Sequence, residues 1–431
     1  MKILFKNIAL LYENGEVETG MCLATNDKII DYIGKTEPEH IPFDRIIDGT
    51  GKLLCPGFYN CHTHSPMTLF RGYAEDLPLS RWLHEKIFPA EDRLYPEAVH
   101  AATMLSAAEM IKNGTVSCSD MYFFCDQIVD AIDVSGMKAN ISRSLVAFDP
   151  NITSETDARF QEAKELFNRY HNTADGRIKI DMSVHAEYST VAAMPRYLSD
   201  FALENGLAIQ VHISESAAEH RECIERNGMT PTEFFMQNGL FRVPVVAAHC
   251  VHLSDHDMQI FSQCGATAVH NPSSNLKLGS GVMPLDKLLD AGVNVALGTD
   301  GAASNNALDI LKEAYLAAIL QKGITGDTAK LSSKRFIPLL TENGAKAQGR
   351  VNCGKIKEGY AADLVMMDFD AINVIPVYNY CDSFLYSANS SNIVMTMVDG
   401  KILYENGDYK TIDIEKIKYQ FHNVINTYFG D

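Results

Sequence analysis

Histidines and acidic residues recur in this sequence at the ends of short runs of apolar or small residues. The first run ends in Asn60-Cys61-His62-Thr63-His64, with histidines at alternate positions. Side chains at alternate positions of a strand point the same way, so His62 and His64 can offer two imidazoles to one ion. Later runs end at or near His185, His212, His249, His270 and Asp300. This pattern is typical of a metal site at the ends of neighbouring strands.

We expect His62, His64, His212 and Asp300 to converge on one divalent ion. Any one of these histidines, taken alone, would more often be a hydrogen-bonded structural residue. Together they offer three nitrogen donors and one carboxylate, a set that suits Zn²⁺ or Fe²⁺. Such an ion activates a water molecule as a nucleophile near neutral pH. The set therefore predicts a metal-dependent hydrolase.

Eight strand-like runs surround these residues and alternate with stretches of helical pattern. In segments 96–112 and 284–291 the apolar residues are spaced three to four apart, as in amphipathic helices. Eight strands that alternate with helices predict an α/β fold of the TIM type, a (β/α)₈ barrel with its active site at the carboxyl ends of the strands. The eight runs are 53–64, 115–120, 139–147, 178–185, 208–212, 245–249, 266–270 and 293–300.

At both ends of the chain, strand-like segments occur without the alternating helices of the barrel. We expect a small β-sandwich domain built from residues 1–52 and 353–431, beside a hydrolase barrel over residues 53–352. The last segment, 414–428, carries apolar residues on one stripe and predicts an amphipathic helix. The strand-like segments are 2–11, 21–33, 354–368 and 392–405.

Composition excludes several classes of partner. The chain of 431 residues has 37 Lys and Arg against 55 Asp and Glu, a formal net charge of −18. This acid excess argues against nucleic acid and against an anionic membrane surface as partners. The ten cysteines are scattered, without a C-x-x-C pair, as in a reduced cytoplasmic protein. We find neither a secretory leader nor an apolar run of membrane-spanning length.

Around the expected ligands the sequence carries the motifs Pro56-Gly57-Phe58, Ser65-Pro66-Met67-Thr68, Arg71-Gly72, His270-Asn271-Pro272-Ser273-Ser274-Asn275 and Leu297-Gly298-Thr299-Asp300-Gly301-Ala302-Ala303-Ser304-Asn305-Asn306. These motifs resemble the amidohydrolase superfamily and, within it, the methylthioadenosine/S-adenosylhomocysteine deaminase family. The resemblance covers essentially the whole chain. It implies hydrolytic deamination of the 6-amino group of an adenosine-type small molecule, such as S-adenosylhomocysteine, 5′-methylthioadenosine or adenosine, and it favours a homo-oligomer.

The resemblance also implies catalytic roles, and it names the same four metal ligands. Glu215, shortly after His212, would take a proton from the attacking water and deliver it to the purine nitrogen N1. His249 would hydrogen-bond the hydroxide or the tetrahedral intermediate, and Asp300 would accept a proton as well as bind metal. His270 would either orient a ligand or be purely structural.

Further residues match substrate-binding positions of the family. Glu91 corresponds to a ribose-binding glutamate, since a carboxylate can bridge two ribose hydroxyls. Arg143 and Arg159 correspond to arginines near the amino-acid tail of S-adenosylhomocysteine, although Arg159 could instead be an exposed helix residue. His185 would contact the purine ring. Trp82 would wall the pocket or belong to the core.

Three alternatives stay open. Another deaminase or chlorohydrolase of the superfamily would act on guanine, a pterin, cytosine or an s-triazine, and would leave Glu91, Arg143 and Arg159 idle. A catalytically dead barrel could serve as a scaffold, but the full ligand set argues against it. Enzymes that cut cyclic amides commonly bridge two metals with a carboxylated lysine on the fourth strand. The fourth run here ends in Ser183-Val184-His185-Ala186-Glu187, without lysine, which favours one metal.

Overall fold

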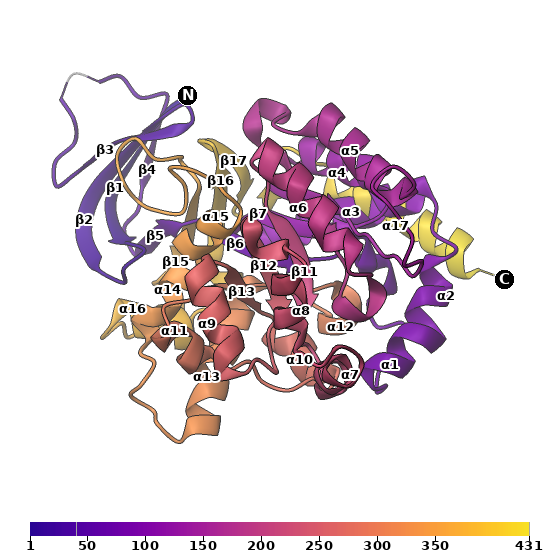
Figure 1. Ribbon diagram of the computed structural model, residues 1–431. Coiled ribbons are helices and arrows are strands. Elements are labelled where there is room, and N and C mark those ends of the chain that lie inside the picture. The colour runs from indigo at the N-terminus through magenta and orange to yellow at the C-terminus, as the bar shows by residue number, and fades with distance from the viewer. Residues whose placement is uncertain (40, 431) are drawn as a thin grey trace.

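The computed structural model describes residues 1–39 and 41–430, and its strands form a barrel and a separate sheet (Figure 1). The barrel strands lie in two parallel sheets. In order, the first sheet contains β6 (Phe58–Thr63), β7 (Thr115–Tyr122), β8 (Lys138–Arg143) and β9 (Ile178–Ile180). The second contains β10 (Met182–Val184), β11 (Ile209–Ile213), β12 (Val245–His249), β13 (Thr267–His270) and β14 (Asn294–Leu297).

The two parallel sheets meet at both edges. The fourth expected strand changes partner at Asp181, so its first part, β9, pairs with β8 and its second part, β10, pairs with β11. At the opposite edge, the amide of Asp300 donates to the carbonyl of His62 over 2.9 Å and joins the end of β14 to β6. The alternating pattern of the sequence thus placed all the barrel strands.

Helices follow the barrel strands and cover their outer side (Figure 1). The longer ones are α3 (Pro96–Lys112), α4 (Cys125–Ser135), α5 (Ala158–Tyr170), α6 (Ala193–Asn205), α7 (Ala217–Asn227), α8 (Pro231–Gln237), α9 (Asp255–Cys264) and α13 (Ile310–Thr325). The shorter ones are α1 (Leu79–Trp82), α2 (Phe88–Glu91), α10 (Pro272–Lys277), α11 (Leu285–Asp290), α12 (Ala302–Asn305), α14 (Ile337–Leu340), α15 (Glu342–Ala347) and α16 (Tyr380–Asp382).

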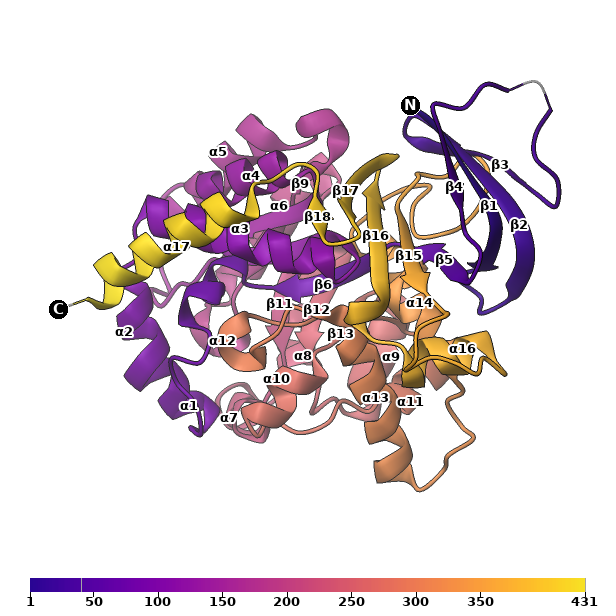
Figure 2. The same cartoon turned by 180° about the vertical axis from the view of Figure 1, so that it is seen from behind.

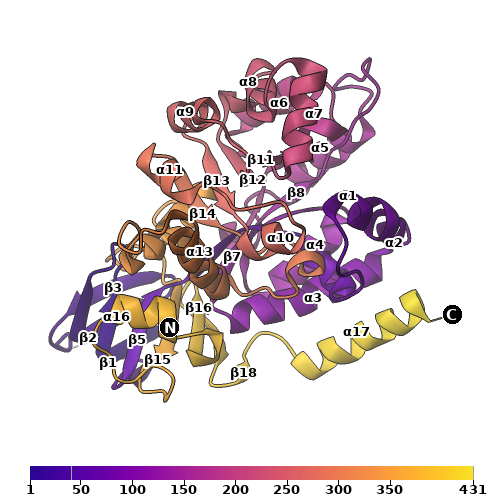
Figure 3. The ribbon, with the colours of Figure 1, turned by 90° about the horizontal axis from the view of Figure 1, so that it is seen from below.

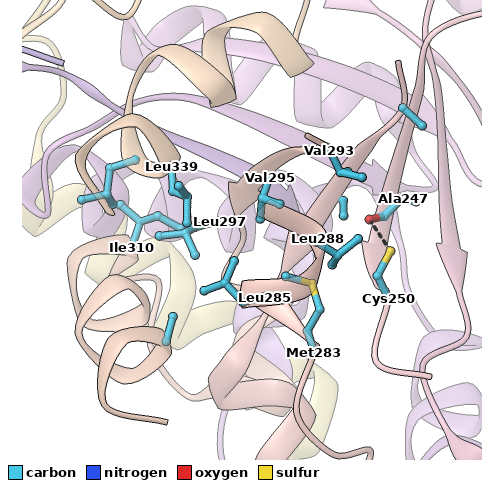
Figure 4. Close-up of a cluster of buried hydrophobic side chains, with 14 of the residues drawn as sticks. Ala247, Cys250, Met283, Leu285, Leu288, Val293, Val295, Leu297, Ile310 and Leu339 are labelled. Atoms are coloured by element: carbon cyan, nitrogen blue, oxygen red, sulfur yellow. Dashed lines mark hydrogen bonds between the residues drawn. The ribbon is translucent and has the colours of Figure 1, made fainter. Parts of the chain in front are cut away.

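Apolar side chains between strands and helices hold the barrel together. Val295 and Leu297 on β14 point toward Leu285 of α11 and Ile310 of α13 (Figure 4), and all four are fully buried. Burying such a side chain contributes about 1.5–3 kcal/mol. This packing fixes the strands from outside, so their carboxyl ends are free to carry polar side chains.

The two ends of the chain form one nine-stranded sheet beside the barrel (Figure 1). Phe5 and Leu23 from the N-terminal strands share a buried core with Leu364 and Met397 from the C-terminal strands. The sheet therefore has its own core made from both termini. Its strands are β1 (Lys2–Leu11), β2 (Val17–Asn26), β3 (Ile29–Gly34), β4 (Arg45–Asp48), β5 (Lys52–Pro56), β15 (Leu364–Asp368), β16 (Ile393–Val398), β17 (Lys401–Glu405) and β18 (Asp408–Tyr409).

Two segments, β5 and the last helix, lie differently from the domain boundaries that we expect from the sequence. Strand β5 continues the terminal sheet to Pro56, which lies opposite Leu364 of β15, so the sheet extends past residue 52. Helix α17 (Ile414–Phe429) lies along α3 of the barrel, as seen from behind and from below (Figures 2 and 3). Ile417 packs there against Met104 of α3. The last helix thus covers the barrel, although it follows the sheet strands in the chain.

All ten cysteines are free thiols, and eight of them are buried. Among the described residues, none of the helices has both the length and the apolar character needed to cross a membrane.

Candidate active site

The four expected metal ligands come together at the carboxyl ends of three barrel strands. His62 lies on β6, His64 directly after it, His212 on β11 and Asp300 shortly after β14. The ring centroids of His62 and His64 are 4.8 Å apart, and those of His62 and His212 are 4.9 Å apart. The Nε2 atoms of His62 and His64 lie 3.5 and 3.3 Å from Asp300 Oδ1. Four side chains from distant parts of the sequence thus share one centre.

Hydrogen bonds to backbone carbonyls fix the tautomer of two of these histidines. His64 Nδ1 donates to the carbonyl of Met121, and His212 Nδ1 donates to the carbonyl of His185, each over 2.6 Å. A carbonyl only accepts, so Nδ1 carries the proton and Nε2 keeps its lone pair.

His62 Nε2 is buried and has no hydrogen-bond partner. Buried polar atoms normally have one. This unpaired nitrogen lies beside the Asp300 carboxylate and the Nε2 lone pairs of His64 and His212. Such a set of donors fits a divalent metal ion.

Burial keeps His62 and His212 neutral, as metal ligands must be. It lowers the pKa of His62 to about 4 and holds the pKa of His212 well below the ordinary value. Both imidazoles therefore have a lone pair available at neutral pH.

Asp300 is held as an ionised carboxylate by several neighbours. Its backbone has a positive φ of 61°, an uncommon conformation outside glycine. Oδ2 accepts hydrogen bonds from Ser274 Oγ at 2.6 Å and Ser304 Oγ at 3.0 Å, and Oδ1 accepts from the amide of Gly301 at 2.7 Å. Burial acts to raise the pKa of Asp300, but the neighbouring imidazole of His62, ahead of that of His64, holds that pKa well below the ordinary value.

Glu215 and His249 face each other beside this centre. Glu215 Oε2 lies 3.7 Å from His249 Nε2, and Ser280 Oγ donates to Glu215 Oε1 over 3.2 Å. Burial raises the pKa of the Glu215 carboxyl and so favours its protonated form. Burial lowers the pKa of His249, but the carboxylates of Glu215 and Asp300 raise it, and the net direction is upward. His249 Nδ1 donates to Asn275 Oδ1 over 2.8 Å, which orients the ring.

A second glutamate fixes the loop that carries Glu215. The Glu219 carboxylate accepts the backbone amides of Ser214, Glu215 and Ser216 over 3.0, 2.7 and 3.4 Å. Ser214 has a positive φ of 50°, so these bonds hold a strained turn. Burial raises the pKa of Glu219 to about 7. Sequence reasoning missed this residue, although Ser216 and Glu219 have the spacing of a capping box at the start of α7.

A cavity of about 1140 Å³ opens above the centre. All the residues expected from the sequence to be catalytic, metal-binding or substrate-binding line it except His62, which lies beneath with 2% of its surface exposed. A volume of this size accommodates a nucleoside with an attached tail.

Glu91, Trp82 and His185 also line the cavity, and the His185 ring lies 5.0 Å from that of His212. Tyr122 donates to Glu91 Oε1 over 2.6 Å. Burial raises the pKa of Glu91 to about 7, against the effect of this hydrogen bond. Trp82 is buried, and its indole nitrogen donates to the carbonyl of Ala74 over 3.2 Å. His185 Nδ1 lies 2.9 Å from Ser189 Oγ, and burial lowers the pKa of the imidazole to about 4.

Two arginines stand at the outer end of the cavity. Arg143 Nε donates to Glu162 Oε2 over 2.8 Å. Arg159, at the start of α5, is exposed, and its Nη1 lies 3.5 Å from the carbonyl of Val146. The structure thus places Arg159 on a helix surface that also faces the cavity.

His270 does not line the cavity. It is fully buried at the end of β13, and both of its ring nitrogens lack a hydrogen-bond partner among the described residues. Burial lowers its pKa to about 3, which makes it a neutral residue behind the site.

Comparison with known sequences gives matches over nearly the whole chain. A model of the amidohydrolase family matches residues 53–403. A protein of Acetivibrio thermocellus named 5-methylthioadenosine/S-adenosylhomocysteine deaminase is 40% identical over 432 residues, which cover 98% of this chain and 99% of that protein. A protein of the same name from Dictyoglomus thermophilum is 41% identical over 420 residues and 97% of each chain.

Solved structures share the architecture. An adenosine deaminase from Xanthomonas campestris with bound zinc superimposes with a TM-score of 0.93 at 29% identity, over 100% of this chain and 99% of that one. A zinc-bound atrazine chlorohydrolase from Arthrobacter aurescens has a TM-score of 0.91 at 21% identity, over 98% of this chain and 100% of the other, which shows likeness of fold. These matches confirm the expected fold class, a (β/α)₈ barrel with a β-domain from both termini.

Proposed function

This chain belongs to the amidohydrolase family, as its motifs predicted, and we propose that it is a hydrolytic deaminase of adenosine-type small molecules. The reaction replaces the 6-amino group with oxygen and releases ammonia, to give an inosine-type product. Relatives of about 40% identity named 5-methylthioadenosine/S-adenosylhomocysteine deaminase support this activity. We place S-adenosylhomocysteine and 5′-methylthioadenosine before adenosine as substrates.

One observation carries the proposal. His62 shares one cluster of possible ligand atoms with His64 and Asp300 and a second one with His212 and His249, next to a cavity that Glu215 also lines. A scaffold protein has no need for buried histidines with free Nε2 lone pairs and a carboxylic acid beside them.

We propose that His62, His64, His212 and Asp300 hold one divalent ion, with zinc as the preferred metal. An ion in this position supplies Lewis acidity, which lowers the pKa of water and gives a nucleophile at neutral pH. The solved adenosine deaminase with bound zinc supports this choice over iron.

Proton transfer is the task of Glu215. Its carboxylate takes a proton from the attacking water, and the resulting acid gives that proton to N1 of the purine. The raised pKa of Glu215 suits a group that must hold a proton between these two steps. His249 Nε2 is placed to donate to the oxygen on C6 of the tetrahedral centre. Asp300 accepts the remaining proton of that C6 hydroxyl and passes it to the amino group, which leaves as ammonia.

The remaining residues bind the substrate. Glu91 accepts hydrogen bonds from the ribose hydroxyls, His185 contacts the purine ring and Trp82 closes one wall of the cavity. Arg143 and Arg159 hold the carboxylate of an amino-acid tail. A bare base such as guanine would leave Glu91 and both arginines unused, which weighs against the other deaminases and chlorohydrolases of this fold.

Ammonia release tests the proposal. Zinc-loaded protein is expected to deaminate S-adenosylhomocysteine, 5′-methylthioadenosine or adenosine. The Glu215→Gln variant keeps its metal and loses activity by about 10²–10⁴-fold, the usual contribution of a general acid and base. Zinc analysis of the same sample separates loss of the proton carrier from loss of the metal. Normal turnover by Glu215→Gln would contradict this proton path.

We also propose a cytoplasmic location and a homo-oligomeric state. Free cysteines throughout the chain are consistent with a reducing compartment. Sedimentation analysis of the purified protein measures the oligomeric state directly.

A further inference from the structure

Helix α5 presents charges of both signs to the outer end of the cavity. Arg159, Glu162, Glu165 and Arg169 all line it. Their spacing of three to four residues places them along one side of the helix. Arg143, at the end of β8, faces them from the barrel. The outer end therefore carries both signs of charge, whereas a simple carboxylate site would need only arginines.

Most of these charges have a partner within the protein. Arg143 Nε lies 2.8 Å from Glu162 Oε2, and Arg143 Nη1 also donates to the carbonyl of Ser144. Arg169 pairs with Asp126 over 2.9 Å. Only 16% of the Arg143 side chain is exposed, against 57% for Glu162. Glu162 can therefore move at modest cost, while Arg143 stays in place under it.

The pair of Arg143 and Glu162 restricts which tail can bind. A tail with only a carboxylate would compete with Glu162 for Arg143 and would leave the glutamate charge without a partner. An α-amino acid carries a carboxylate and an ammonium group on the same carbon. Inserting it replaces one ion pair by two, because the carboxylate meets an arginine and the ammonium meets Glu162. The exchange keeps every charge compensated.

We infer that Glu162 binds the α-ammonium group of the amino-acid tail of S-adenosylhomocysteine, while Arg143 and Arg159 bind its carboxylate. This inference rests on the proposed function. Arg159 and Glu162 are three residues apart on α5 and so are neighbours on the helix surface. Glu162 thus determines specificity: it favours a zwitterionic tail over a purely anionic one.

Three substrates test the role of Glu162 in the zinc-loaded protein. They are S-adenosylhomocysteine, 5′-methylthioadenosine, and the analogue of S-adenosylhomocysteine that lacks only the α-amino group. For Glu162→Gln, the ratio of kcat/KM for S-adenosylhomocysteine to that for 5′-methylthioadenosine should fall about tenfold, chiefly through KM, as for a lost hydrogen bond to a charged group. For the same variant, the ratio of kcat/KM for the analogue without the amino group to that for 5′-methylthioadenosine should rise, because Glu162 no longer competes with the analogue's carboxylate for Arg143.

Glu165→Gln is the matched control. This residue lies on the same side of α5 and lines the cavity, but it has no ion pair among the described residues. Its substitution removes the same charge and should change either ratio by less than about twofold, the size of a weak surface electrostatic effect.

The outcomes separate this inference from the proposed function. If Glu162→Gln leaves the ratio for S-adenosylhomocysteine unchanged or raises it, Glu162 is only an internal partner of Arg143 and the inference is wrong. If the unsubstituted protein releases ammonia from 5′-methylthioadenosine in that case, the proposed function still stands. If it releases ammonia from none of the three nucleosides, the proposed function itself fails.

Discussion

At the inner end of the cavity the polar side chains come from strand ends and are buried. At the outer end most of them come from helix α5 and are exposed, and only Arg143, from the end of β8, is mostly covered. His64 and His212 each donate to a backbone carbonyl over 2.6 Å. Arg159 makes a single 3.5 Å contact with a carbonyl. The inner groups are thus fixed before any ligand arrives, and the outer groups can adjust to different tails.

This difference matches the two tasks that we propose. Moving a proton between water and a purine ring requires fixed positions, because small misplacements cost large factors in rate. Selecting among 5′ substituents requires only a difference in affinity. Substitutions at the inner end should therefore change kcat and metal content, and substitutions at the outer end should change KM for charged tails alone.

The largest expected effect follows from removing a metal ligand. His212→Ala takes one nitrogen from the proposed site, so bound zinc should fall to a trace and activity should fall by about 10³-fold or more. Zinc analysis measures the first effect and ammonia release the second. The unsubstituted protein should also gain thermal stability when zinc is added, and this shift should vanish in the variant.

His256→Ala is a suitable control for that substitution. The His256 side chain is 62% exposed and lies 3.7 Å from Glu233, away from the cavity. Full zinc occupancy in His212→Ala would mean that His249, which has a ring nitrogen within 4.8 Å of ligand atoms of His62 and His212, takes part in the metal site instead.

A smaller effect is expected from the hydrogen bonds that hold Asp300. Ser274→Ala removes the 2.6 Å bond to Oδ2 and leaves the bond from Ser304. Loss of a hydrogen-bond partner of a metal ligand typically weakens metal affinity about 10–100-fold. Competition with a zinc chelator measures the change. Ser199→Ala, which alters a buried serine on α6 outside the cavity, should leave zinc affinity unaltered. An unaltered affinity in Ser274→Ala would show that the inner end is less constrained than we propose.

The sequence predicted the barrel and the inner cluster because both leave strong local signals. Histidines at strand ends are uncommon, and the alternation of strands with helices constrains where the ends meet. The supporting residues leave no such signal. Ser274 and Asn275 were visible as parts of a motif, but serine and asparagine occur everywhere. Only the folded structure assigns Ser274 to Asp300 and Asn275 to His249.

Two features of the fold depended on contacts that no local pattern specifies. The amphipathic pattern of 414–428 predicted a helix, but not that Ile417 would pack on the barrel helix α3. The fourth strand read as one continuous run, yet it changes partner at Asp181. The Asp181 carboxylate accepts hydrogen bonds from Asn140 and Gln210 on the neighbouring strands. A buried aspartate in a strand must have hydrogen-bond partners, but the sequence does not show that the strand changes its neighbour at this residue.

The smallest effect is expected at Arg159, the outermost of the proposed binding residues. Arg159→Gln should raise KM for S-adenosylhomocysteine about threefold, within the range of a solvent-exposed ion pair, and should leave kcat and the KM for 5′-methylthioadenosine unaltered. Arg196→Gln, at an exposed arginine on α6 outside the cavity, is the control. Because the pair is exposed, the effect should shrink as salt is added. A change in kcat would contradict the separation between the two ends, since it would mean that this exposed helix residue reaches the reacting atoms.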